Sequence, residues 1–463
     1  MQNGRTGWRF LLTLLGAVSL GLYAGERGPA AEGDGPGLTR LASVPGGQGA
    51  IEGPTGKSVW PGRRYSEPAR DPLEAEMARL EGRLSSHPND YEAQLLKGLL
   101  YFKSGKLEAA LDELETLTER APKFRLAHLI QGDLLLAQTR TVTDIGAGLL
   151  RGTDDAGEKR LQGLRAEADA RLRAYLDSLQ GRLLPRPLLH LDPAVQTALV
   201  VDKDSHRLFV YRRGDHGNLS LVRDFYVSTG KLRGNKSLRG DLKTPEGVYY
   251  VTRHIDDEAL PDKYGRGAFP VNYPNDLDRH LGKTGDGIWL HGTSSRDYSR
   301  PPKDSEGCVV LANLDLAVAA DYIEPGRTPV VIADGVEWLP PDRWEGLKGE
   351  VLAALEAWRA DWESTEPERY LAHYADGFWA PGHDRASWSD YYRRVLARKE
   401  WQEIEIEDVS VYGYPDSASD GRPMVVAEFR QAYDSNNFSS TMDKRLYLVR
   451  EDGTWRVLYE GPQ

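Results

Sequence analysis

The stretch from Ile288 to Asn313 constrains the fold most, because two short apolar runs flank a turn that holds the only cysteine of the chain. Residues 288–290 (IWL) predict the end of a buried strand, with His291 and Gly292 at its tip. Residues 305–308 (SEGC) predict a tight turn, and 309–311 (VVL) lead back into apolar packing. A glycine at 307 lets the backbone bend and approach a substrate closely.

Cys308 and His291 are candidates for a nucleophile and its base. A thiol becomes a strong nucleophile as a thiolate, and a nearby imidazole can hold it in that state. The N–H groups of Gly307 and Cys308 are candidate donors to an oxyanion. The alternative is structural, because a lone cysteine is usually a small buried hydrophobe and a histidine near a strand end is often packing. The pair alone does not decide between the two interpretations.

The order His291-Gly292-Thr293 followed by Ser305-x-Gly307-Cys308 resembles the signature of the YkuD-type L,D-transpeptidases. Further segments match that family at 243–249 (KTPEGVY), 268–275 (AFPVNYPN) and 282–289 (GKTGDGIW), and the similarity covers about residues 195–335. The resemblance implies a mainly-β catalytic domain. It also implies action on peptidoglycan stem peptides at the diaminopimelate–D-alanine bond, through a thioester on the cysteine.

The resemblance assigns a role to each residue of the signature. Cys308 attacks the carbonyl, His291 protonates the leaving D-alanine, and the Gly292 carbonyl orients the imidazole as the third member of a triad. The oxyanion and substrate-binding group is Gly307, Ser305 and Thr293, with Ser305 holding either the turn or the substrate. This chemistry implies no metal and no cofactor.

One position departs from the family pattern. Many members have arginine two residues after the cysteine, whereas this chain has Val310. Any role of that arginine toward the fold or a terminal carboxylate must then fall to other groups. The candidate cations are Lys243, Arg266, Arg296 and Lys303, although each is more often a solvated surface charge.

The N-terminal segments predict export. Residues 1–25 combine Arg5 and Arg9 with an apolar run at 10–23, which is short for a membrane span and typical of a signal peptide. An uncleaved membrane anchor is the alternative, and either places the body of the protein in the periplasm or cell envelope. Residues 26–68 are rich in Gly and Pro and predict a disordered linker.

Residues 69–180 predict helices, with two pairs of residues that recur 34 positions apart: Pro88 with Pro122, and Gly98 with Gly132. This spacing resembles tetratricopeptide repeats, and a plain helical hairpin bundle is the alternative. In either form the region is a candidate docking surface for an envelope protein or for a second copy of the chain.

Two further domains follow. Residues 184–340 contain short strands with turn signals, which predict the mainly-β catalytic domain as a sandwich or barrel. Residues 345–463 begin with helices, including a predicted one at 370–374, and continue with four strands. That order resembles the α+β NTF2-like cone, for which we expect a structural or binding role. The fold class is therefore multidomain, with α-helical, mainly-β and α+β parts.

Composition excludes some functions. The net charge of −11 and the pI of about 5.5 give no basic surface for nucleic acid. A single cysteine cannot form an intrachain disulfide, which leaves a cysteine nucleophile without a partner to pair with.

The domain order resembles that of the L,D-carboxypeptidases that set cell shape in helical bacteria. This favours trimming of tetrapeptide to tripeptide. The alternatives are an L,D-transpeptidase that forms 3–3 cross-links or attaches proteins to peptidoglycan, and a catalytically silent scaffold that binds muropeptides.

Overall fold

The computed structural model describes residues 72–142, 145–146, 154–177, 183–416, 418 and 421–463. The chain forms two compact units, one with the described residues up to 115 and those from 133 to 146, the other with 116–132 and all described residues from 154 onward. The predicted signal or anchor and the predicted linker lie outside the described residues. Within the described part, no helix is long and apolar enough to cross a membrane.

The N-terminal part is helical, as predicted. Its helices are α2 (Pro72–Ser86), α3 (Tyr91–Lys103), α4 (Leu107–Arg120), α5 (Arg125–Ala137) and α6 (Asp155–Asp177). Asp90 caps α3 by accepting a hydrogen bond from Ala93 N at 2.9 Å, which satisfies a backbone donor that the helix itself leaves unpaired. At Gly98, an added Cβ would lie 3.3 Å from Leu114, so a glycine here allows α3 and α4 to pack closely.

The central domain is built on a five-stranded sheet in the order β4-β3-β2-β11-β6. Its strands are β2 (Thr197–Asp202), β3 (Arg207–Arg213), β4 (Leu219–Tyr226), β6 (Gly247–Tyr250) and β11 (Pro329–Ala333). Alternate residues of β2 enter two different apolar cores, Leu199 and Val201 one, Ala198 and Val200 the other. Both faces of the sheet are therefore buried, which explains the unbroken apolar runs in these strands.

A smaller three-stranded sheet, in the order β10-β8-β7, packs onto one of these cores. Its strands are β7 (Ala268–Pro270), β8 (Trp289–His291) and β10 (Val309–Val310), and a bridge from Ser228 to Val310 links it to the segment after β4. His291 is the last residue of β8 and Gly292 follows it, so the predicted position at the strand tip is confirmed. Around these sheets lie β1 (Leu184–Pro185), β5 (Thr229–Gly230), η1 (Asp257–Ala259), η2 (Asp262–Tyr264), α7 (Asp276–His280), β9 (Lys303–Ser305), α8 (Asn313–Ala320) and β12 (Trp338–Leu339).

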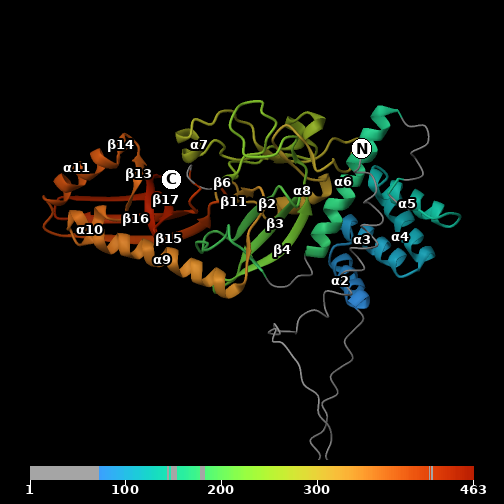
Figure 1. Ribbon diagram of the computed structural model, residues 1–463, viewed down its shortest axis with the longest axis horizontal. Coiled ribbons are helices and arrows are strands. Elements are labelled where there is room, and N and C mark those ends of the chain that lie inside the picture. The colour runs from blue at the N-terminus through green and yellow to red at the C-terminus, as the bar shows by residue number, and fades with distance from the viewer. Residues whose placement is uncertain (1–71, 143–144, 147–153, 178–182, 417, 419–420) are drawn as a thin grey trace, which may run out of the picture. The chain divides into compact units, whose positions relative to one another are not determined.

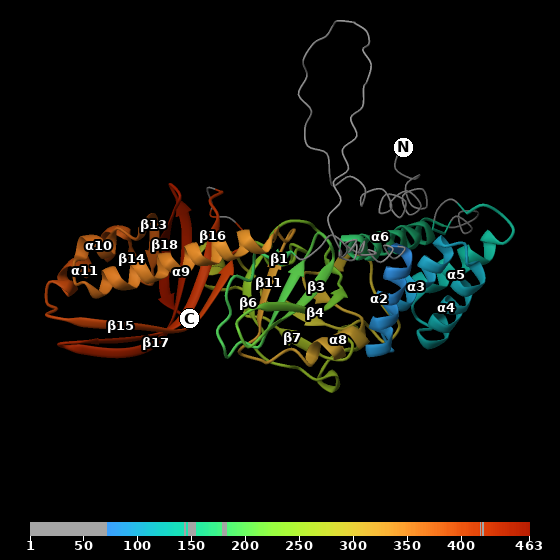
Figure 2. The same ribbon diagram turned by 90° about the horizontal axis from the view of Figure 1, so that it is seen from below.

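The C-terminal domain packs helices on a six-stranded sheet, and α9 runs along the sheet in Figures 1 and 2. The helices are α9 (Pro341–Glu363), α10 (Pro367–Leu371) and α11 (Arg385–Leu396). The sheet order is β14-β13-β18-β17-β16-β15. Its strands are β13 (Tyr374–Ala380), β14 (His383–Asp384), β15 (Gln402–Gly413), β16 (Met424–Ser435), β17 (Phe438–Glu451) and β18 (Thr454–Pro462).

The four predicted C-terminal strands are confirmed. The turn between β17 and β18 places Asp452 and Gly453 at φ of +48° and +81°, as a tight hairpin requires. The predicted helix at 370–374 is wrong in its second half, because α10 ends at Leu371 and Tyr374 begins β13. The aromatic residues there suit either structure, and burial of Tyr374 against the sheet decides for the strand.

The space between α9 and the sheet is filled by side chains. Trp362 stacks on Tyr370 of α10 and Tyr433 of the sheet, and Trp358 meets Phe429 of the sheet at a tilt. The buried Glu460 accepts a hydrogen bond from Tyr374 and pairs with Lys444, whose ammonium lies 4.8 Å from the Trp362 ring centre. Glu460 and Lys444 therefore satisfy each other's charge inside an aromatic core.

The C-terminal domain is fastened to the central domain by polar contacts. Arg445 pairs with Asp276 at 2.9 Å, and Asn235 donates to Asp416 at 2.8 Å. The Trp379 ring stacks on His280 with 3.8 Å between centres. The central-domain partners lie on α7 and in the 231–246 segment. These contacts hold two segments that lead to the turn of Cys308, because Lys243 packs against Gly307 and Gly287 lies beside the thiol.

Candidate active site

His291 is buried on β8, and its ring is held by its own neighbour. Nδ1 lies 2.7 Å from the Gly292 carbonyl oxygen, which is the contact predicted for an orienting carbonyl. A carbonyl can only accept, so Nδ1 carries the proton in the neutral ring and Nε2 is left with a free lone pair. His291 therefore presents Nε2 as a base.

Tyr264 of η2 packs against the same ring. Its ring meets that of His291 edge to face at 5.0 Å, and its carbonyl accepts a hydrogen bond from Gly292 N at 2.9 Å. Asn313 ties the neighbouring segments together by donating to Thr293 O and accepting from Arg266 N. The Gly292 carbonyl and the Tyr264 ring therefore hold the imidazole in place, and neither contact uses Nε2.

The turn before Cys308 is closed by Ser305. Ser305 Oγ donates to the Cys308 carbonyl at 2.6 Å and accepts from Gly307 N at 3.1 Å. Gly307 has φ of +135°, and a Cβ there would lie 2.8 Å from the Lys243 carbonyl oxygen. Only glycine fits this position without displacing the backbone of the neighbouring segment.

Strand register brings the two candidate catalytic residues to one face. β8 and β10 are parallel, with Val309 opposite Leu290 and Val310 opposite His291. Continuing this register by one residue sets Cys308 opposite Trp289, two residues before His291. Side chains two apart along a strand share a face, so the thiol and the imidazole project to the same side of the sheet.

The structure gives Gly307 and Thr293 contacts other than those predicted. The expectation that Gly307 N–H faces an oxyanion is corrected, because that N–H donates to Ser305 Oγ. This leaves the Cys308 N–H as the donor candidate of the turn. Thr293 is buried, and its hydroxyl lies 3.0 Å from Asp297 O and 3.2 Å from Tyr298 O, so it holds the following loop. A role for Thr293 in substrate binding stays a prediction.

Burial shifts the pKa of each candidate catalytic group in the direction that favours its neutral form. Burial lowers the pKa of His291 to about 4, against which the Gly292 hydrogen bond acts only in part. Burial also raises the pKa of the Cys308 thiol above its ordinary value of 9.0, although a backbone hydrogen bond from Trp289 opposes that rise. The thiol accordingly points at the Gly287 carbonyl oxygen, 3.4 Å away, as a donor would. Both pKa shifts favour the neutral thiol and the neutral imidazole over a resting thiolate–imidazolium pair.

Arg300 and Lys263 supply the positive field at the site. Their charges lower the pKa of Cys308 and of His291 alike. The Lys263 ammonium lies 4.7 Å from the Tyr264 ring centre, and within the described residues no ion pair joins Arg300 or Lys263 to a carboxylate. Lys243, Arg266, Arg296 and Lys303, the cations predicted from sequence, do not act on both groups. Nothing in the sequence singles out Lys263.

Val310 occupies the position at which many members of the resembled family have arginine. Its side chain is buried, and its backbone both pairs with His291 in the sheet and bridges to Ser228. By the same register, the side chain at 310 lies on the face that Cys308 and His291 share, so valine leaves that face without the charge of an arginine. The positive charge near the catalytic pair therefore comes from other segments.

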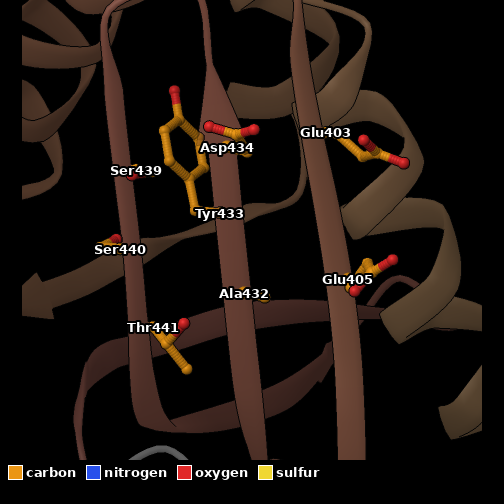
Figure 3. Close-up of a pocket in the computed structure, with 8 residues that line it drawn as sticks. All are labelled: Glu403, Glu405, Ala432, Tyr433, Asp434, Ser439, Ser440 and Thr441. Atoms are coloured by element: carbon orange, nitrogen blue, oxygen red, sulfur yellow. The ribbon is translucent and has the colours of Figure 1, made fainter.

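Elsewhere the described residues offer little competing chemistry. No group of three or more His, Cys, Asp or Glu among them could hold a metal ion. The C-terminal sheet carries an open hollow, shown in Figure 3, with the carboxylates of Glu403, Glu405 and Asp434 beside hydroxyl groups of β17. Like charges at this spacing repel an anionic peptide. The three carboxylates do not pair with the hydroxyl groups of β17, so the hollow holds no activated nucleophile.

Comparison with known families decides the class of the domains. Residues 196–332 match the family model of the L,D-transpeptidase catalytic domain, YkuD. The chain contains an L,D-transpeptidase domain. Residues 350–461 match the Cds6 C-terminal NTF2-like domain. Residues 76–123 and 95–149 match the tetratricopeptide repeat, which favours repeats over a plain helical hairpin bundle for this region. Cys308 and His291 both fall within the matched catalytic region.

Two solved structures are similar to this chain over more than half of its length. Bd1075 from Bdellovibrio bacteriovorus is 28% identical, with a TM-score of 0.53 over 60% of this chain and 97% of that one. The helical cell shape determining protein Pgp2 from Campylobacter jejuni is 26% identical, with a TM-score of 0.52 over 60% of this chain and 95% of that one. No curated protein sequence matches the chain.

The neutral resting state predicts how Cys308 reacts with iodoacetamide. Only the thiolate reacts, so the alkylation rate should rise about tenfold per pH unit and should still rise at pH 9, because the thiol pKa lies above 9.0. His291→Ala should leave this profile almost unchanged, since a neutral imidazole does not hold a thiolate. Mass spectrometry of the Cys308 adduct over time gives the rate at each pH. A plateau between pH 6 and 8 that disappears in His291→Ala would restore the ion pair.

Proposed function

We propose that this protein is an L,D-carboxypeptidase that trims peptidoglycan stem tetrapeptides to tripeptides. The observation that carries the proposal is the placement of Cys308 and the free nitrogen of His291 on one face of an L,D-transpeptidase domain. The products are a tripeptide ending in diaminopimelate and free D-alanine.

The reaction proceeds in two acyl-transfer steps. His291 Nε2 takes the thiol proton as the Cys308 sulfur attacks the carbonyl of the diaminopimelate residue, which forms an S–C bond and an oxyanion. The oxyanion collapses, the amide C–N bond breaks, and His291 returns the proton to the departing amine of D-alanine. Water, deprotonated by the same nitrogen, then cleaves the thioester. Transfer of the proton during attack suits a pair that is neutral at rest.

The positive field favours water over an amine as the second reactant. A cross-linking enzyme must admit the side-chain amine of a second stem peptide, which is a cation until it is deprotonated. Arg300 and Lys263 repel such a cation near the thioester but do not affect a neutral water molecule. Screening at physiological salt acts over about 8 Å and weakens this effect only beyond the immediate site.

The same cations suit the terminal carboxylate of the substrate. Trimming acts on a D-alanine whose carboxylate lies one residue from the bond that breaks. A guanidinium binds carboxylates through paired hydrogen bonds, and Arg300 lacks such a partner in the described part of the chain. We assign carboxylate binding to Arg300, with Lys263 in support.

Two further parts of the proposal concern the setting. The signature of export at residues 1–25 and the substrate class both favour the periplasm or cell envelope. The likeness to a protein described as determining helical cell shape favours a role in shape, with the tetratricopeptide repeats as a docking surface for an envelope partner or a second copy.

Incubation of the purified protein with disaccharide-tetrapeptide should give tripeptide in excess of cross-linked dimer. Cys308→Ala should abolish turnover because one thiol supplies the covalent step, and His291→Ala should lose about as much, since members of one catalytic unit are not additive. Mass spectrometry separates the products. Dominant 3–3 dimer would make the protein a transpeptidase, and no product with an unmodified Cys308 would favour the scaffold.

Arg300→Gln should raise KM for tetrapeptide about tenfold, the size expected for a lost charged hydrogen bond, while kcat changes less. A tetrapeptide whose terminal carboxylate is amidated should show no such difference between the variant and the parent. Arg296→Gln is the matched control, because it removes a cation of the same loop that does not act on the catalytic pair. An equal loss with both substrates would remove Arg300 from carboxylate binding.

Residues 1–60 fused to a reporter that is active only outside the cytoplasm should give an active reporter, because Arg5, Arg9 and the apolar run at 10–23 form an export signal. Substituting two leucines of the apolar run by aspartate should silence it. A stable but silent parent fusion would contradict the proposed location.

A further inference from the structure

The loop at 293–304 links the base to the nucleophile and carries Arg300. Its own contacts close its first turn, where Thr293 holds the carbonyls of Asp297 and Tyr298, and Ser294 Oγ donates to Asp297 at 2.9 Å. These local bonds do not reach Arg300, whose backbone is held from outside the loop. The Tyr226 hydroxyl, at the end of β4, donates to the Arg300 carbonyl at 2.8 Å.

The corner between α4 and α5 packs on the first half of this loop, within the same compact unit. The Phe124 ring lies 4.2 Å from the Tyr298 ring. Arg125 pairs with Asp297 at 2.8 Å, and the Lys123 ammonium donates to the Ser295 carbonyl. The exposed pair contributes little, whereas the fully buried Phe124 provides apolar contact.

Helix α6 holds the second half of the loop through a buried ion pair. Glu167 and Arg171 are each only 2% exposed in their side chains and lie 2.9 Å apart. Ser299 Oγ donates to Glu167 at 2.7 Å, so the loop supplies one of the hydrogen bonds that this carboxylate needs. At Gly163 of α6, an added Cβ would lie 2.9 Å from Pro301, which shows how closely the helix approaches the loop.

The Arg171 guanidinium joins the helical elements to the central sheet. It lies over the Tyr226 ring at 4.1 Å and over the Phe124 ring at 5.3 Å. A buried ion pair is weak evidence for stability, because removing two charges from water costs several kcal/mol per ion. The pair instead sets positions, because its two charges contact Tyr226, Phe124 and Ser299. Of these, Ser299 precedes Arg300 in the chain and Tyr226 holds its carbonyl.

We propose that α6 and the α4–α5 corner act as a clamp that holds the 293–304 loop and thereby aims Arg300 at the catalytic pair. Glu167, Ser299 and Tyr226 are its positioning residues. The proposal rests on the proposed function for the role of Arg300 toward substrate, but not for the contacts themselves. Helix α6 lies in none of the regions that the family models match, so the clamp is a feature of this chain that those matches do not imply.

The clamp is tested with Ser299→Ala and Tyr226→Phe, which each remove one hydroxyl and leave the ion pair and the rings in place. The double variant should raise KM for tetrapeptide about fivefold, with kcat little changed, as one or two hydrogen bonds allow. In an Arg300→Gln background the same two substitutions should add less than about twofold, because the residue through which they act is gone. Ser220→Ala, which removes an exposed hydroxyl from β4, is the control.

Alkylation of Cys308 gives a readout that needs no substrate. The charged groups that act on the thiol are Arg300 from the loop, Lys263 from η2 and Glu306 from the turn. Of these, only Arg300 lies next to the contacts of Ser299 and Tyr226, because the loop meets η2 at Ser295 instead. Its charge lowers the thiol pKa, so loosening the loop raises that pKa. At a fixed pH of 8, the alkylation rate of Cys308 should fall severalfold in the double variant and also in Arg300→Gln. The variant that combines all three substitutions should be no slower than Arg300→Gln alone.

The outcomes separate the clamp from the proposed function. If the parent protein makes no tripeptide but alkylation slows as described, the clamp stands and the proposed function fails. Unchanged alkylation in the double variant overturns the clamp, and so does a full additional effect in the Arg300→Gln background. A fall in melting temperature with KM and alkylation both unaltered would show that these hydroxyls serve stability alone.

Discussion

The parallel pairing of β8 with β10 is the contact on which the rest of the site depends. It joins segments that are separated by the whole 293–304 loop, and its register decides that Cys308 and His291 share a face. A shift by one residue would turn the thiol to the opposite side of the sheet. The surroundings work against such a shift: Val310 is pinned to Ser228, Ser305 closes the turn, and Gly307 fits against the Lys243 carbonyl.

Much of this architecture could be predicted from sequence because its signals are local. Apolar runs located the central strands to within a few residues, and the hairpin at Asp452–Gly453 followed from its turn residues. The signature around Cys308 pointed to the segments that form the candidate site. The predictions failed where distant packing decides. Tyr374 belongs to a strand because it is buried against the sheet, and the Gly307 N–H is occupied because the Ser305 side chain folds back on its own turn.

The charges near the site were the hardest part to predict. Four cations named from sequence do not act on both catalytic groups, whereas Arg300 and Lys263 do. A cation's place depends on the path of the loop that carries it, and the path of 293–304 is set by helices more than 100 positions earlier in the chain. The neutrality of the Cys–His pair likewise depends on burial, which residue types alone do not show.

The raised pKa of the Cys308 thiol also affects how this residue reacts with oxidants. Hydrogen peroxide and related oxidants attack thiolates far faster than thiols, and the first product, a sulfenic acid, is normally rescued by a second cysteine. This chain has no second cysteine. A single thiol whose pKa is raised is a slow target for such oxidants, so the environment that raises the pKa of Cys308 also protects its sulfur.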